Sequence, residues 1–129
     1  MKRQLLFEKL HQQIQPAITK NITIAVDGID AAGKTTFADA LAKFLSLGAQ
    51  KDVVRATVDS WMNPPEVRYA PGRESAEGYY RNSFDWVAVK RYVQEQIVQD
   101  PGSRLLVFDG VFAFTDELNA LWDYRILLA

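Results

Sequence analysis

The sequence predicts an α/β fold with a mainly parallel β-sheet between layers of helices. Two observations lead to this prediction. Short β-branched or apolar runs alternate with segments whose apolar residues recur at helical spacing. Two of the runs also end in an acidic residue, where parallel sheets place their ligands. The predicted strands are 22–26, 53–59, 105–109 and 124–128, and the predicted helices are 3–15, 34–47, 85–99 and 115–121.

The three long helices are predicted from apolar stripes at spacings of three or four residues, which turn one helix face toward a core. Pro16, Gly48 and Pro101 lie at or just beyond their ends. A shorter helix over 75–81 is a further expectation. The stripes are Leu6, Phe7, Leu10 and Ile14; Phe37, Leu41, Phe44 and Leu45; and Trp86, Val89, Val93 and Ile97.

The predicted strands differ in polarity. The run 105–109 is apolar up to its final acid, as expected for a parallel strand buried on both faces. The run 53–59 carries Arg55 and Thr57 on one side, which favours a partly exposed edge strand. The last strand, 124–128, presents an open edge unless something pairs with it. A homo-oligomer formed through this edge is therefore an expectation.

The segment between the first strand and the second helix reads G-x-x-x-x-G-K-T, the phosphate-binding loop or Walker A motif. The glycines allow successive backbone N–H groups to turn inward on a polyphosphate, and the following helix N-terminus adds donors. Lys34 is predicted to reach the β- and γ-phosphates, and Thr35 to ligate Mg²⁺. ATP and Mg²⁺ are thus the expected cofactors of a three-layer P-loop NTPase fold. The predicted nucleotide-binding residues are Gly28, Ile29, Asp30, Ala31, Ala32, Gly33, Lys34, Thr35 and Thr36.

Two acids follow strands and are expected near this loop, because the carboxyl ends of parallel strands meet at one edge. Asp109 ends a buried strand and is predicted to lie near the Mg²⁺. Asp59 ends the strand 53–59 and is interpreted either as a catalytic acid or as the cap of a turn. Asp85 precedes a predicted helix and could be its N-cap. The convergence of the loop with Asp59 and Asp109 favours an enzyme.

These motifs occur in the order found in the uridine kinase and phosphoribulokinase family, which the chain resembles from about residue 22 to 128. They are the phosphate loop, Asp59-Ser60-Trp61, Phe84-Asp85 and Asp109-Gly110. The resemblance implies transfer of the ATP γ-phosphate to a nucleoside 5′-hydroxyl, such as that of uridine or cytidine. It also implies residue roles: Asp59 and Lys34 catalytic; Thr35 and Asp109 at the metal; Phe84, Asp85, Tyr69, Tyr79 and Tyr80 around the acceptor, with Asp85 on the ribose hydroxyls.

Two alternatives remain open. Gly28-Ile29-Asp30 also resembles thymidylate kinase, although Asp59-Ser60-Trp61 lacks the Asp-Arg-aromatic spelling expected there, so a nucleoside monophosphate kinase is one alternative. In the uridine kinase family an arginine-bearing lid, a further strand and an adenine-contacting loop follow the fourth strand, whereas this sequence stops there. A fragment or a non-catalytic nucleotide-binding module is therefore the other alternative. A GTPase is disfavoured because no Asn-Lys-x-Asp sequence occurs.

The composition is that of one compact domain of 129 residues, with an N-terminal helix over 1–16 and a nucleotide-binding core over 22–129. The net charge of −1 gives no reason to expect nucleic acid or a membrane surface as partner. Cysteine is absent, so thiolate chemistry is excluded. No apolar run reaches the length of a membrane span, and a cytoplasmic protein is expected. His11 and the arginines Arg68, Arg73 and Arg81 are interpreted as surface residues.

Overall fold

The computed structural model describes residues 2–14, 20–28, 33–48, 52–64, 66, 83–99, 104–110, 113 and 118–128 of the chain. The predicted helix 75–81 and part of the predicted helix 115–121 lie outside these residues. The candidate residues outside them are Ile29, Asp30, Ala31, Ala32, Tyr69, Tyr79 and Tyr80, together with Arg68, Arg73 and Arg81. Their roles stay predictions.

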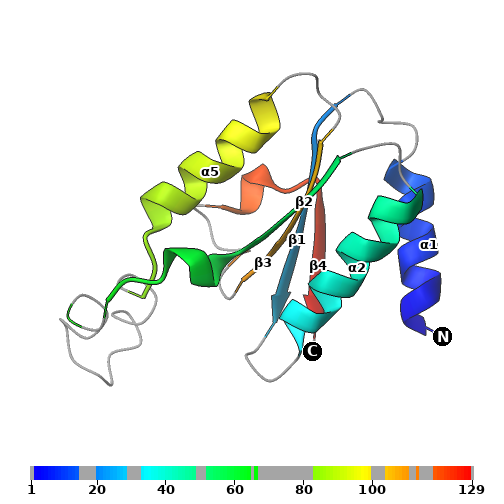
Figure 1. The fold of residues 1–129 in the computed structure, drawn as a ribbon, viewed down its shortest axis with the longest axis horizontal. Coiled ribbons are helices and arrows are strands. Elements are labelled where there is room, and N and C mark those ends of the chain that lie inside the picture. Colours follow the sequence, from blue (N-terminus) through cyan, green and yellow to red (C-terminus); the bar gives the residue numbers. More distant parts are fainter. Residues whose placement is uncertain are drawn as a thin grey trace.

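The described strands form one parallel sheet in the order β2-β3-β1-β4 (Figure 1). Their bounds are Ile22–Gly28 for β1, Asp52–Thr57 for β2, Arg104–Asp109 for β3 and Tyr124–Leu128 for β4. The two central strands, β1 and β3, are almost entirely buried, whereas β2 and β4 are partly exposed along their length. The predicted edge position of the second strand is therefore confirmed. Pairing of β4 with a second copy of the chain stays a prediction.

The second strand is shorter than predicted. It ends at Thr57, and Val58–Trp61 form a 3-10 helix, η3. The backbone N–H of Asp59 donates to the Thr57 hydroxyl at 3.4 Å, and this side-chain cap turns the chain out of the sheet. Strand propensity continues through Val58 in the sequence, but the local cap overrides it. Asp59 thus lies on a turn beyond the strand.

Helices cover both faces of the sheet, giving three layers (Figure 1). On one face lie α1 (Lys2–Ile14) and α2 (Lys34–Gly48), and on the other lies α5 (Trp86–Val98). The predicted stripes face the two cores, except that Leu6 is 39% exposed at the rim. At the end of the predicted helix 115–121, the described residues form only a short 3-10 helix, η4 (Asn119–Leu121). Among the described residues, no helix is long and apolar enough to cross a membrane.

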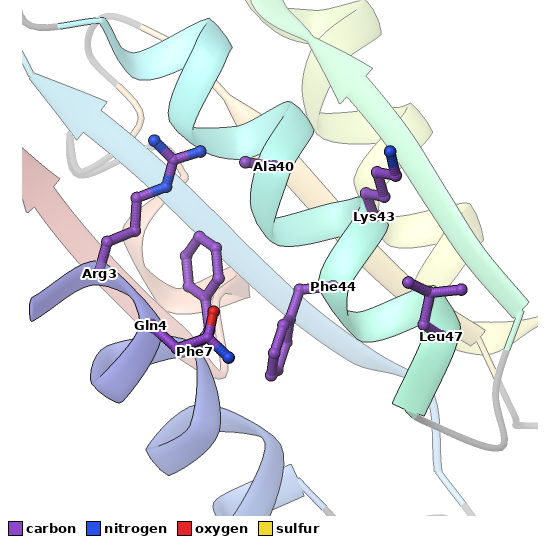
Figure 2. Close-up of a pocket in the computed structure, with 7 residues that line it drawn as sticks. All are labelled: Arg3, Gln4, Phe7, Ala40, Lys43, Phe44 and Leu47. Atoms are coloured by element: carbon purple, nitrogen blue, oxygen red, sulfur yellow. The ribbon is translucent and has the colours of Figure 1, made fainter. Parts of the chain in front are cut away.

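The contact between α1 and α2 is aromatic. The ring of Phe7 lies 5.4 Å from those of both Phe37 and Phe44, and the Arg3 guanidinium lies 5.6 Å from the Phe7 ring. A pocket of about 420 Å³ opens beside these rings, with Lys43 and Leu47 on its α2 side (Figure 2). It follows the middle and last turns of α2. The first turn of α2, which carries Lys34 and Thr35, is not part of its lining.

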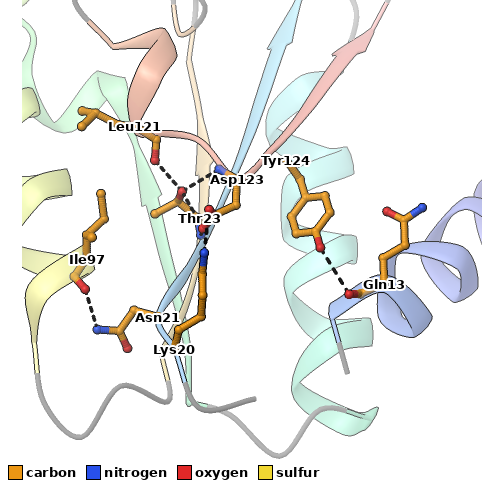
Figure 3. A network of polar contacts seen from close by, with 8 residues as sticks. All are labelled: Gln13, Lys20, Asn21, Thr23, Ile97, Leu121, Asp123 and Tyr124. Atoms are coloured by element: carbon orange, nitrogen blue, oxygen red, sulfur yellow. Dashed lines mark hydrogen bonds and ion pairs between the residues drawn. The ribbon is translucent and has the colours of Figure 1, made fainter. Parts of the chain in front are cut away.

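A polar network joins the amino-terminal ends of the central strands to their neighbours (Figure 3). Thr23 on β1 donates through its hydroxyl to the Leu121 carbonyl at 2.6 Å, and its N–H donates to the Asp123 carboxylate at 2.9 Å. Asn21 donates to the carbonyls of Ile97 and Gln99 at 3.0 and 2.6 Å. These bonds pair the buried polar side chains of Asn21 and Thr23 where β1, α5 and the start of β4 meet.

Replacing Asn21 with alanine should lower the free energy of unfolding by about 2–3 kcal/mol, because the carbonyls of Ile97 and Gln99 and the N–H of Arg104 lose their shared partner. Asn21 is only 8% exposed, and its side-chain oxygen also accepts from the Arg104 N–H at 2.8 Å. Urea unfolding measures the effect. Lys20→Met is the control, since Lys20 forms an exposed ion pair with Asp123 and its loss should cost less than about 1 kcal/mol. Equal losses in both variants would contradict the prediction.

Candidate functional site

The carboxyl ends of β1 and β3 and the first turn of α2 meet at one point. Strand β1 ends at Gly28, and α2 begins after Gly33, whose φ of +73° lies in the left-handed region that favours glycine. The Gly33 carbonyl accepts the N–H of Phe37 at 2.9 Å and so opens the helix. Lys34 is the first residue of α2 and is half-buried. The strand and helix predicted on either side of the glycine loop are thus present.

Asp109 lies beside this helix start. It is the last residue of β3 and is 1% exposed. Its Oδ2 accepts a hydrogen bond from the Thr35 hydroxyl at 2.8 Å. Thr35 and Asp109, predicted separately as metal-associated residues, are therefore in direct contact although they are 74 residues apart in the chain.

Arg55, which no motif in the sequence indicates, also lies in the site. Its Nη2 lies 2.5 Å from Asp109 Oδ1, and only 22% of its side chain is exposed. The contact is an ion pair rather than a well-aligned hydrogen bond, because Oδ1 accepts no hydrogen bond from the described residues. Arg55 was expected on a partly exposed side of its strand, but α2 covers that side. An arginine between apolar residues of a strand, close before an acid, is the signal that could have found it.

The contacts of Arg55 tie three elements together. Its Nε donates to Asp39 Oδ1 on α2 at 2.9 Å, and its Nη2 lies 3.5 Å from the Thr35 carbonyl. Its Nη1 donates to the carbonyl of Ala56 and, at 3.5 Å, to that of Val107 on β3. The guanidinium is thus held between β2, β3 and the first turns of α2. Such multiple contacts use the fixed fork of arginine donors.

The oxygen atoms at this point suit a magnesium ion. Thr35 and Asp109 supply a hydroxyl and a carboxylate, which are hard ligands. Within the described part of the chain, Asp109 Oδ1 accepts no hydrogen bond and is contacted only by the Arg55 guanidinium. Among the described residues, no group of three or more His, Cys, Asp or Glu side chains could enclose a metal. Mg²⁺ commonly uses one or two protein ligands and completes its shell with water and substrate phosphates. The donor set therefore fits the expected ion.

Asp59 lies on the turn beyond the neighbouring strand. Thr57 on β2 pairs with Asp109 on β3, and Asp59 comes two residues after Thr57 in the chain. Its side chain is exposed, and its carbonyl accepts the Met62 N–H at 3.3 Å. The turn packs tightly against the chain after β3, because a Cβ added at Gly110 would lie 2.8 Å from Val58 Cβ. Only glycine fits there, which gives the Asp109-Gly110 pair a structural reason.

Aromatic rings pack the turn that carries Asp59 against α5 and β3. The ring of Trp61, at the end of η3, lies 5.0 Å from Tyr92 on α5 and 6.3 Å from Phe108 on β3. Burial raises the pKa of the Tyr92 hydroxyl, and the positive charge of Arg104 partly offsets this. The rings anchor the backbone that carries Asp59, while the carboxylate itself stays accessible. No spacing in the sequence indicates this role.

Phe84 and Asp85 are held against the same turn. Met62 and Phe84 form an antiparallel bridge, and the Asp85 N–H donates to the Trp61 carbonyl at 2.9 Å. Asp85 is the N-cap of α5, since its Oδ1 accepts the Ala88 N–H at 3.1 Å. The expectation that Asp85 caps a helix is therefore confirmed, and its contact with the ribose hydroxyls stays a prediction. Phe84 is only 4% exposed and packs in the core, and its predicted place near the acceptor stays a prediction.

Comparison with solved structures identifies the fold. A possible uridine kinase from Bacillus stearothermophilus superposes with a TM-score of 0.81 at 18% sequence identity, over 98% of this chain and 81% of that one. A candidate fructose transport system kinase from Silicibacter sp. TM1040 gives 0.77 at 17% identity, over 98% and 74%. No family model matches the sequence, and no curated protein sequence does either. The chain thus has the fold of P-loop kinases.

Proposed function

We propose that this protein is an ATP-dependent phosphotransferase that transfers the γ-phosphate to the 5′-hydroxyl of a nucleoside such as uridine or cytidine. The hydrogen bond between Thr35 and Asp109 carries the proposal. It brings together a hydroxyl from the helix that follows the glycine loop and an acid that ends the adjacent strand, and these are the two kinds of group that hold Mg²⁺ in P-loop NTPases. The names of the two similar structures, one a possible uridine kinase, support a kinase rather than another NTPase.

Each residue of the site has a separate role in the proposed reaction. Lys34 neutralises charge on the β- and γ-phosphates, and Thr35 and Asp109 hold Mg²⁺, which supplies further neutralisation when it is bound. Asp59 orients the acceptor hydroxyl and takes its proton. The acceptor oxygen bonds to the γ-phosphorus, the bond from that phosphorus to the bridging oxygen breaks, and ADP leaves with the bond's electron pair. Positioning and charge neutralisation provide most of the rate increase in such reactions.

The direct test is transfer of label from γ-labelled ATP in the presence of Mg²⁺. We expect a labelled nucleoside monophosphate with uridine or cytidine, and a loss of about 10²-fold or more in Lys34→Ala. Lys43→Ala is the matched control, because Lys43 lies on the same helix in the α1–α2 pocket. Its transfer rate should equal that of the wild type.

Transfer assays with acceptors other than nucleosides distinguish the proposed nucleoside kinase from the alternative functions. Transfer to thymidine monophosphate rather than to nucleosides would favour the nucleoside monophosphate kinase, and transfer only to fructose would make the protein a sugar kinase. Mg-ATP binding without transfer to any acceptor would replace the proposal with a non-catalytic nucleotide-binding module. A folded sample that does not bind Mg-ATP would overturn every nucleotide-based interpretation.

A further inference from the structure

The contact between Arg55 and Asp109 places a fixed positive charge on the carboxylate that we assign to the metal. The two carboxylate oxygens of Asp109 have different partners: Oδ2 accepts from the Thr35 hydroxyl, and Oδ1 contacts Arg55 Nη2. The carboxylate is 1% exposed, so water cannot compensate its charge. A buried carboxylate needs a positive partner, and Arg55 is that partner among the described residues.

The position of Arg55 is also fixed. Asp39 on α2 holds its Nε at 2.9 Å, and the carbonyls of Ala56 and Val107 hold its Nη1. A guanidinium held on both sides cannot move away from Asp109 without losing these contacts, of which that to Asp39 lies at the surface. A divalent cation that approaches Asp109 therefore meets a positive charge on the same carboxylate, and like charges at such distances repel strongly where water is excluded.

We propose that Arg55 is a built-in counter-ion that prevents Asp109 from binding a divalent cation until a nucleotide supplies negative charge. The free protein then binds Mg²⁺ or Mn²⁺ weakly, and the metal enters together with the phosphates. Arg55 also acts as a positioning residue, because its hold on Oδ1 turns Oδ2 toward Thr35. The role of the phosphates rests on the proposed function, whereas the effect on free cations does not.

The alternative is that Arg55 is only a structural link between β2 and α2 through Asp39. A purely structural link predicts a loss of stability in variants and no change in cation affinity. The counter-ion role predicts that removal of the positive charge strengthens cation binding at Asp109. Affinity for a free cation, measured without nucleotide, therefore separates the two.

The experiment is a titration with Mn²⁺ alone, followed by electron paramagnetic resonance of the free ion. Arg55→Gln should bind Mn²⁺ at least about tenfold more tightly than the wild type, because one neighbouring positive charge is removed. Arg55→Lys keeps the charge and should stay within about threefold of the wild type. Adding Asp109→Asn to Arg55→Gln should abolish the gain, which assigns the ion to that carboxylate.

The matched control is Arg125→Gln, which removes the same charge from β4, where the arginine bonds to Asn119. An equal gain in this variant, or no gain in Arg55→Gln, would overturn the proposal. If Arg55→Gln is unstable, thermal unfolding with and without Mn²⁺ gives the same answer. The melting temperature should rise with Mn²⁺ in that variant but not in Arg55→Lys, and equal responses would overturn the proposal.

The result is independent of the proposed catalytic activity. A wild type that transfers phosphate while Arg55→Gln shows no gain in Mn²⁺ affinity refutes the counter-ion role alone. A gain in Mn²⁺ affinity in a protein that transfers no phosphate supports the counter-ion role and refutes the phosphotransferase.

Discussion

Replacing Asp59 with asparagine should lower kcat for phosphate transfer by about 10²–10⁴, the range that a positioned general base contributes. Asparagine keeps the size of the side chain but cannot take the proton from the acceptor hydroxyl. The affinity for Mg-ATP should stay within about twofold, because a group that acts only on the acceptor does not contribute to nucleotide binding. Steady-state kinetics and a separate Mg-ATP titration measure the two effects.

Asp52→Asn provides the control for this variant. Asp52 is exposed at the first position of β2, whereas Asp59 follows the other end of that strand. The same loss of charge at position 52 should leave kcat unchanged. Turnover by Asp59→Asn at the wild-type rate would remove Asp59 from the catalytic role and leave it as a turn residue.

Phe108→Ala should have the largest effect on stability, a loss of about 3–5 kcal/mol in the free energy of unfolding. Phe108 is fully buried on the central strand β3, and its ring stacks on Trp122 with 5.2 Å between the centroids. Trp61 packs against the same ring at 6.3 Å. Alanine removes a large apolar surface and leaves a cavity between rigid rings that cannot close it.

Urea unfolding measures this loss, and Leu127→Ala is the control. Leu127 lies on the edge strand β4 and is 69% exposed, so its truncation should change stability by less than about 0.5 kcal/mol. A loss below about 1.5 kcal/mol in Phe108→Ala would show that Trp61 and Trp122 move in to fill the space. That outcome would contradict rigid packing around Phe108.

The sequence predicts those parts of the fold that depend on neighbours in the chain. The glycine loop between β1 and α2, the apolar strand that ends in Asp109 and the stripe of α5 all follow from local spacing. The paired ends of β1 and β3 follow from the general geometry of parallel sheets. For this reason the contact of Thr35 with Asp109 could be expected before any distance was known.

Other features depend on contacts between distant segments. Arg55 looks exposed in the sequence because its partners, Asp39 and Asp109, come from a helix and from another strand. The buried position of Phe84 follows from its bridge to Met62, which no spacing indicates. The early end of β2 depends on one weak local hydrogen bond, from the Asp59 N–H to the Thr57 hydroxyl. Strand propensity alone does not predict this bond.

The strand order has a consequence for how the chain reaches this structure. The central strand β1 is formed early in the sequence, but both of its partners, β3 and β4, come much later, and Thr23 meets Asp123 across 100 residues. During synthesis the edges of β1 therefore stay without their strand partners until β3 and β4 have left the ribosome. Such non-local pairing slows folding, because the loop between the partners must close first. Unpaired strand edges of this kind make incompletely folded chains prone to aggregate.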